Sequence, residues 1–200
     1  MVYKRYQQPE ARAVLALIAI NIIFLIALLV KDNLYVTLGL QSATWYKEPW
    51  TLVTSLFVHD FPWHILFNMF TLYFLGSYLC NIIGDTRFCI VYFVGGIVGN
   101  FFFILVEHLM GNYGLAYGAS GAIFAVGGAF AVLAPKMKVM IFPIPVQMPL
   151  WVAIIGGFLI LTLIAILADP SIGWQAHTGG LLTGLIAGYI LKKRGKYVLL

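Results

Sequence analysis

The stretch YGASGAIFAVGGAFAVLA, residues 117–134, decides the class of fold. Apart from Tyr117 and Ser120, it contains only glycine, alanine, aliphatic and phenyl side chains. An apolar run of this length is typical of a helix inside a lipid bilayer. A single serine in such a helix usually bonds to its own backbone or to a neighbouring helix. Any further role of Ser120 therefore depends on polar residues at the same depth.

The composition of the whole chain also indicates a membrane protein. Its 200 residues are 62% hydrophobic and 10% charged, with a mean hydropathy of +0.96. A soluble domain of this size could not cover so much apolar surface. The stretches apolar enough to span a bilayer are 13–30, 63–83, 88–109, 117–134, 149–168 and 174–191. We predict an all-α membrane protein, with residues 1–200 forming a single bundle of six transmembrane helices.

The basic residues predict the orientation of this bundle. Those on one side of the six spans are Lys4, Arg5, Arg12, Arg87, Lys136, Lys138, Lys192, Lys193, Arg194 and Lys196, and those on the other are Lys31 and Lys47. The positive-inside rule therefore predicts that both termini are cytoplasmic. The net charge of +5 is then a topology signal, with contacts to anionic lipid, and does not predict a nucleic-acid partner.

Spans two, four and six run in the same direction, and each carries polar residues near its beginning. These are His64 and Asn68 in span two, Ser120 in span four and His177 in span six. At about 100° per residue, Asn68 lies about 40° from His64 around the helix. We expect these side chains to lie at one depth near the external face, where polar groups in a membrane are candidates for function.

Small residues predict how spans four and six meet. On span four, Gly127 and Ala131 share the helix face of the serine. On span six, Gly184 and Gly188 share the face of the histidine. Small residues spaced by four let helix backbones approach closely in lipid. We therefore expect these two faces to pack together and to bring the histidine against the serine.

A serine beside a histidine is the minimum arrangement for nucleophilic catalysis. The hydroxyl of Ser120 needs a base, and the imidazole of His177 titrates near neutral pH. His64 and Asn68 offer N–H donors for a developing oxyanion, and the helix start at Ser120 offers backbone N–H groups. No acid is obvious as a third member, because Asp60 lies in the external loop and Asp169 precedes a proline and is best explained as a helix-ending residue. The pattern predicts peptide-bond hydrolysis by a Ser–His dyad.

Three motifs resemble the rhomboid family of intramembrane serine proteases, in its basic six-helix prokaryotic form. They are HDFPWHILFN (59–68), GASG (118–121) and AHTGGLLTG (176–184). Their order, their spacing and their assignment to spans two, four and six all fit the family. The short GASG motif is a weak signal alone and a strong one when joined to the other two.

The resemblance implies a role for each matching residue. Ser120 would be the nucleophile, His177 the general base, and His64, Asn68 and the Ser120 N–H the oxyanion hole. The supporting residues would be His59, Gly118, Gly121, Phe124, Gly180 and Gly184. Of these, His59 would support the site from the external loop, and Gly180 and Gly184 would let span six pack on span four.

Three positions depart from what is common in the family. Phe124 stands where a tyrosine often stacks on the catalytic histidine, and phenylalanine keeps that stacking. Thr51 stands where an arginine often follows the tryptophan of the first loop, and Cys80 stands where a structural glutamate is frequent. The last two substitutions concern loop stability and access of substrate, and they leave the dyad intact.

The resemblance also implies partners and a location. The substrates would be transmembrane proteins that enter sideways from the lipid bilayer, with span five as gate and the 168–173 loop as cap. A small residue is expected at the cleaved bond, and no metal or organic cofactor is implied. The absence of a visible targeting peptide, and of the extra span usual in mitochondrial forms, predicts the plasma membrane of a prokaryote.

Other functions remain as alternatives. A non-catalytic rhomboid-like protein would bind transmembrane segments, but inactive relatives usually lack the serine or the histidine. A channel would carry charge along a central path, whereas the middle and inner halves of these spans are apolar. A zinc site would need His59, His64 and His177 to converge on one ion, and loss of activity with a chelator would support it.

Overall fold

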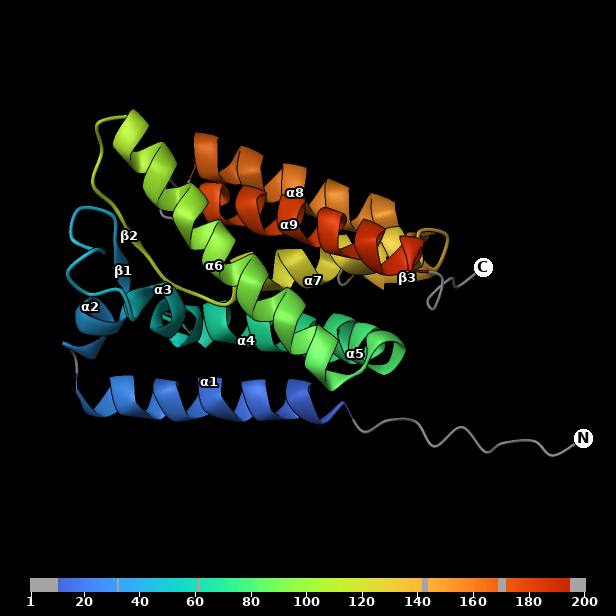
Figure 1. The fold of residues 1–200 in the computed structure, drawn as a ribbon, viewed down its shortest axis with the longest axis horizontal. Coiled ribbons are helices and arrows are strands. Elements are labelled where there is room, and N and C mark those ends of the chain that lie inside the picture. The colour runs from blue at the N-terminus through green and yellow to red at the C-terminus, as the bar shows by residue number, and fades with distance from the viewer. Residues whose placement is uncertain (1–10, 32, 61, 142–143, 169–171, 195–200) are drawn as a thin grey trace, which may run out of the picture.

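The computed structural model describes residues 11–31, 33–60, 62–141, 144–168 and 172–194. Within these residues the chain is an all-α membrane bundle with two small two-stranded antiparallel sheets. Figure 1 shows the long helices lying alongside one another. Asp169 and the basic residues Lys4, Arg5 and Lys196 lie outside the described residues.

Each of the six predicted stretches is helical. The helices are α1 (Arg12–Val30), α4 (Pro62–Thr71), the π-helical segment η2 (Leu72–Gly76), α5 (Ser77–Ile83), α6 (Asp85–Leu109), α7 (Ser120–Leu133), α8 (Leu150–Leu167) and α9 (Trp174–Lys193). Of these, α4, η2 and α5 form one 22-residue helix. Four helices in the described part of the chain are long and apolar enough to cross a membrane: α1, the α4–α5 helix, α6 and α8. Because α7 is shorter and α9 is not among the four, the six-span topology and its orientation stay predictions.

Short elements gather at one end of the bundle, which we call the loop end. They are α2 (Leu34–Leu38), β1 (Leu40–Gln41), α3 (Thr51–Thr54), the 3-10 segment η1 (Ser55–Phe57) and β2 (Leu115–Ala116). Strand β1 pairs with β2 in the register Leu40↔Ala116, which ties the first loop to the residues before α7. At the opposite end, β3 (Lys138–Ile141) and β4 (Ile144–Pro149) form a hairpin between α7 and α8.

Helix α7 is the centre of the bundle. Eleven of its 14 residues are buried, although none of its side chains is larger than phenylalanine. By contrast, α1 buries three of its 19 residues, and α8 buries three of its 18. The exposed side chains of these outer helices are mostly aliphatic, which suits a surface that faces lipid. The small residues of α7 therefore let its neighbours approach closely.

Helices α7 and α9 run parallel, with their backbones in contact. A Cβ atom on Gly180 would collide with the carbonyl oxygen of Gly121, and one on Gly184 would collide with that of Ala125. Both numbers advance by four from one contact to the next, so the two helices share one direction and register. This is the small-residue packing that lipid-embedded helices use.

The prediction that the Gly127 and Ala131 face of α7 packs against α9 is wrong. Gly127 does not face α9, because a Cβ atom there would meet Ile154 of α8 at 3.0 Å. The face toward α9 is instead the row of Gly121, Ala125 and Gly128. The prediction assumed that Ser120 lies on the face that packs against α9, whereas the backbone contact runs along a different row of α7. The histidine reaches Ser120 from the side.

Thr51 and Cys80, which depart from the family pattern, both make hydrogen bonds. The hydroxyl of Thr51 is buried and donates to the carbonyl oxygen of Glu48 at 2.6 Å. The Sγ atom of Cys80 donates to Oδ1 of Asp85 at 3.0 Å. The same Oδ1 atom accepts the backbone N–H of Ala13 at 3.2 Å. Cys80 and Asp85 thus join the first turn of α1 to α5 and α6.

Candidate active site

Ser120 and His177 are brought together by the parallel contact of α7 and α9. Ser120 is the first residue of α7, and His177 lies in the first turn of α9. The Nε2 atom of His177 lies 2.7 Å from the Ser120 Oγ atom. This is hydrogen-bond distance between a hydroxyl and a base, which nucleophile activation requires. The two side chains that the sequence proposed as a pair therefore lie in contact, and their catalytic role stays a prediction.

The Nδ1 nitrogen of His177 is not bonded to an acidic side chain of the described residues. Its Nδ1 atom is buried and has no hydrogen-bond partner among the described residues. With Nε2 accepting the serine proton, the neutral ring carries its hydrogen on Nδ1. Asp169, the acid weighed as a third member, lies outside the described residues. The described geometry is that of a pair.

A cavity of about 650 Å³ opens beside this pair. Its wall contains Ser120 and His177, together with His64 and Asn68 of α4, and Ile154 of α8 contributes on another side. Its volume is within the range of small-molecule and peptide-segment pockets. The Nδ2 atom of Asn68 donates one hydrogen to the carbonyl oxygen of His64 at 3.0 Å, which leaves its second hydrogen for another acceptor.

Gly118 is required by both backbone shape and space. Its φ is +112°, a region that side chains disfavour. A Cβ atom on Gly118 would lie 2.7 Å from Nε2 of His64. The Nε2 edge of His64 therefore lies against the backbone two residues before Ser120. This glycine allows the ring to approach the start of α7.

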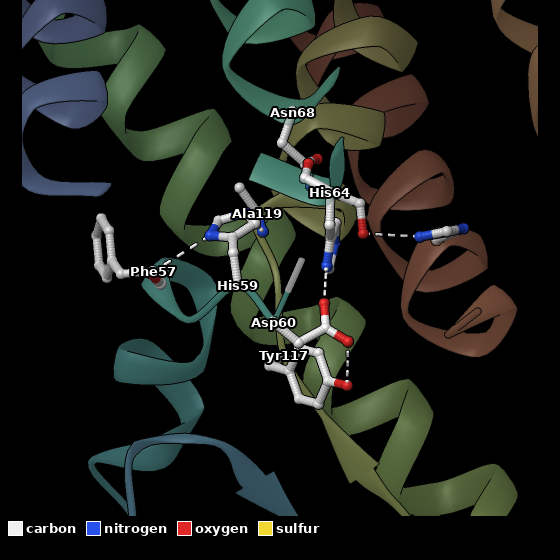
Figure 2. A network of polar contacts seen from close by, with 9 residues as sticks. Phe57, His59, Asp60, His64, Asn68, Tyr117 and Ala119 are labelled. Atoms are coloured by element: carbon white, nitrogen blue, oxygen red, sulfur yellow. Dashed lines mark hydrogen bonds and ion pairs between the residues drawn. The ribbon is translucent and has the colours of Figure 1, made fainter. Parts of the chain in front are cut away.

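His59 links the first loop to the residue before Ser120, as Figure 2 shows. Its Nε2 accepts the N–H of Ala119 at 3.4 Å, and its Nδ1 lies 3.4 Å from the carbonyl oxygen of Phe57. Burial and the nearby His64 ring lower the pKa of His59 to about 3. His59 is therefore neutral at ordinary pH, with Nδ1 protonated and Nε2 an acceptor.

Phe124 packs on the histidine of the pair. Its ring centroid lies 4.8 Å from that of His177, at an interplanar angle of 39°. Its other neighbour is Phe158 of α8, edge-on at 5.8 Å. Phe124 therefore occupies the stacking position that the sequence predicted and connects it to α8.

Two polar groups at the cavity were not predicted as site residues. Asp60 accepts hydrogen bonds from His64 and from Tyr117, each at 2.8 Å. The i, i+4 spacing of Asp60 and His64 is a signal that sequence reading could have used. Glu107 of α6 accepts a hydrogen bond at 2.9 Å from Gln175, two residues before His177. No sequence pattern joins this second pair.

The zinc site considered as an alternative is not formed by the described residues. No group of three or more His, Cys, Asp or Glu side chains there is arranged to hold a metal ion. The rings of His59 and His64 do meet, edge to face, with centroids 4.8 Å apart. Each of them has its own hydrogen-bond partners, Ala119 and Asp60 respectively.

The chain is similar to several proteins with rhomboid names. Rhomboid protein 1, mitochondrial, of Saccharomyces cerevisiae is 31% identical over 145 residues, which is 72% of this chain and 42% of that protein. Presenilin-associated rhomboid-like protein, mitochondrial, of Mus musculus is 31% identical over 140 residues, or 67% of this chain and 36% of its own length. RHOMBOID-like protein 1 of Arabidopsis thaliana is 29% identical over 158 residues, which is 75% of this chain and 36% of that protein. The chain thus spans less than half the length of these relatives.

These names correct the predicted location. The yeast and mouse relatives are both named mitochondrial, whereas the sequence predicted a prokaryotic plasma membrane. That prediction is wrong. It relied on the absence of a targeting peptide and of an extra span. The relatives are more than twice as long as the matched region, so these absences carry no information about the compartment.

The model of the rhomboid domain matches residues 46–194, which include every residue of the candidate site. The match begins in the first loop and ends at the last described residue of the bundle. It covers about three quarters of the chain. Together with the motifs and the similarity to the relatives above, this establishes that the chain belongs to the rhomboid family.

Proposed function

We propose that this chain is a serine endopeptidase that hydrolyses peptide bonds of transmembrane proteins within the bilayer. The observation that carries the proposal is the 2.7 Å contact between His177 Nε2 and Ser120 Oγ at the wall of a cavity. Rhomboid proteases act on transmembrane substrates, and this chain matches the rhomboid domain and carries Ser120 and His177 in contact.

The proposed reaction begins with the hydroxyl of Ser120. Nε2 of His177 takes its proton while Oγ attacks the carbonyl carbon of the substrate. The tetrahedral intermediate collapses, His177 donates the proton to the leaving amine, and an acyl-enzyme remains. Water then attacks the ester, with His177 again as base, and releases the carboxylic acid and Ser120.

The oxyanion of each intermediate needs hydrogen-bond donors. His64, Asn68 and Ser120 all line the cavity, and we assign the free N–H of the Asn68 amide, the ring of His64 and the backbone N–H of Ser120 as these donors. The start of α7 adds the positive end of a helix dipole. Donors fixed in place before the reaction stabilise the transition state without reorganisation.

We propose that substrates enter between α4 and α8. Only Leu150, Ala153 and Ala165 of α8 are buried. A Cβ atom on Gly156 or Gly157 would meet no heavy atom within 4 Å among the described residues. Helix α8 is therefore loosely held along its middle. An entering segment must unwind before its peptide bond is accessible, so helix-weakening residues and a small residue at the cleaved bond are favoured.

The remaining features of the proposal concern topology and location. We propose one domain over residues 1–200 with six transmembrane helices, because α7 and α9 are packed among four helices that can each cross a bilayer. The names of the yeast and mouse relatives favour a mitochondrial membrane as its location. No cofactor takes part in the proposed chemistry.

The test compares the wild type with Ser120→Ala in liposomes, on a transmembrane reporter with a small, helix-weakening cleavage region. Ser77→Ala in α5 is a matched control, because it removes a helical serine hydroxyl away from the cavity. Fragments are identified by mass spectrometry. Cleavage by the wild type and the control alone supports the proposal. Cleavage by Ser120→Ala contradicts it, and no cleavage by any form across several reporters favours a non-catalytic binder of transmembrane segments.

A further inference from the structure

We propose that Asp60 and Tyr117 are positioning residues that hold His64 as an imidazolium, with its Nδ1–H on the carboxylate and its Nε2–H available to the oxyanion. This inference rests on the proposed function, because it assigns the charge state of one oxyanion donor. It adds an acid to the site, placed on the oxyanion side rather than behind the catalytic base.

The two oxygens of the Asp60 carboxylate have separate partners, as Figure 2 shows. Oδ1 lies 2.8 Å from Nδ1 of His64. Oδ2 accepts the hydroxyl of Tyr117, also at 2.8 Å. The carboxylate is thus fixed between the end of the first loop and the residues leading into α7. A carboxylate held at both oxygens has one orientation, and so has the ring bonded to it.

This contact decides where the hydrogens of His64 are. An ionised carboxylate only accepts hydrogen bonds, so Nδ1 of His64 carries a hydrogen. A neutral ring would then have a lone pair at Nε2, which repels an oxyanion. A ring that donates from Nε2 as well must be positively charged. The carboxylate stabilises that charge, since hydrogen bonds between ionised groups are the strong ones.

The Nε2 edge faces the reacting end of the site. It lies against Gly118, where a Cβ atom would be 2.7 Å away. Gly118 is itself fixed, because its N–H donates to the carbonyl oxygen of Ser55 at 2.8 Å. The ring is therefore held by the carboxylate at Nδ1, and its Nε2 edge lies beside the backbone two residues before Ser120.

The other ionisable groups around His64 are consistent with a charged ring. From the first loop these are His59 and Asp60, from the segment between β2 and α7 Tyr117, and from α9 His177. His59 is neutral at ordinary pH because burial lowers its pKa to about 3. Burial alone would raise the pKa of Asp60, but hydrogen bonds from His64 and Tyr117 outweigh it and lower the pKa. Asp60 therefore remains a carboxylate and supplies a negative charge.

Solvent reaches this pair, which allows the ring to exchange protons. The side chains of His64 and Asp60 are 28% and 22% exposed. The ion pair lies at the loop end of the bundle, away from the apolar middle of the helices. The contact between His64 and Asp60 is therefore accessible from outside the bundle.

The experiment measures kcat and KM against pH for wild type, Asp60→Asn, Tyr117→Phe and His64→Ala. We expect kcat of Asp60→Asn to fall about 10- to 100-fold at neutral pH, somewhat less than loss of a whole oxyanion donor. Its KM should stay near the wild-type value, and the pH profile of its kcat should differ from that of the wild type. Tyr117→Phe should show a smaller loss of the same kind. Tyr35→Phe is the matched control, because Tyr35 packs edge-on against Tyr117 at 5.8 Å and should retain wild-type kcat.

A double-mutant cycle separates positioning from a structural role. In the His64→Ala background, Asp60→Asn should cause no further loss of kcat. An equal loss in both backgrounds, or an unchanged kcat and pH profile of Asp60→Asn, would overturn the inference. Labelling of Ser120 by a fluorophosphonate and the unfolding temperature show whether each variant is folded. If Asp60→Asn fails to fold, Tyr117→Phe decides, and a wild-type pH profile for it overturns the inference. Failure of the wild type to cleave any reporter would contradict the proposed function itself.

Discussion

Gly180 of α9 lies directly on the carbonyl oxygen of Gly121 in α7, and a Cβ atom on Gly180 would overlap that oxygen. The contact joins the helices that carry the two members of the candidate dyad. Neither backbone has room to move, because each is packed against the other without intervening side chains. The distance between the serine and the histidine therefore depends on the absence of a side chain at Gly180.

Gly180→Ala should separate α7 from α9 and destabilise the protein. Overpacking typically costs about 1–3 kcal/mol, and a clash with backbone is relieved only by moving a helix. The unfolding temperature in detergent and the cleavage rate should both fall. Gly156→Ala is the control, because its Cβ atom would meet no heavy atom within 4 Å among the described residues. Equal stability of the two variants would contradict the packing argument.

Loss of an oxyanion donor should lower kcat more than it changes KM. His64→Ala and Asn68→Ala are each expected to reduce kcat by about 10²- to 10³-fold, since both donors act on charge that develops in the transition state. Thr71→Val is the control within the same cavity, because the Thr71 hydroxyl already donates to the carbonyl oxygen of Phe67 at 2.8 Å. Full turnover by both alanine variants would refute the oxyanion assignment.

Phe124 should hold the imidazole of the dyad in place. Phe124→Ala removes the ring 4.8 Å from that of His177, and an aromatic contact of about 0.5–1.5 kcal/mol corresponds to a loss of roughly 2- to 12-fold in kcat. Phe124→Tyr keeps the ring and should retain turnover. The comparison is made by steady-state kinetics on one reporter. A tyrosine variant as slow as the alanine variant would show that the ring contact is not the cause.

Acid should destabilise the link between the first loop and α7. The pKa of His59 is about 3 in the folded protein and near 6.5 in an unfolded chain. Because the folded value is the lower one, the unfolded state binds the proton first. The contribution of neutral His59 to the free energy of unfolding is complete above about pH 6.5. It is lost as pH falls toward 3, at up to about 1.4 kcal/mol per pH unit.

His59→Gln should weaken this pH dependence, since an amide can donate and accept but does not titrate. The free energy of unfolding would be measured between pH 3 and pH 8 for both proteins. The difference between the unfolding free energies of the two proteins should shrink as pH falls. Only the wild type has a histidine that is neutral when folded and protonated when unfolded. Parallel curves would mean that His59 is not the titrating group.

The sequence predicted the parts of the site that depend on helix depth. Ser120, His177 and His64 were found because each is a polar residue near the start of an apolar helix. The contact of Asp60 with Tyr117 was not found, because these residues are 57 positions apart and no local pattern joins them. The face of α7 was mistaken because Ser120 was assumed to lie on the face that packs against α9.

The short length of α7 has a consequence for the membrane itself. At 1.5 Å per residue, its 14 residues extend about 21 Å, whereas a hydrocarbon core is about 30 Å thick. If the hairpin end of α7 is level with one interface, Ser120 lies several ångströms below the opposite one. Ser120 would then stand in a recess, at a depth that lipid would otherwise occupy, and it lines the cavity described above. Bilayer thickness then governs which residue of a spanning segment stands opposite Ser120, so thicker membranes should shift the cleaved bond along the same substrate.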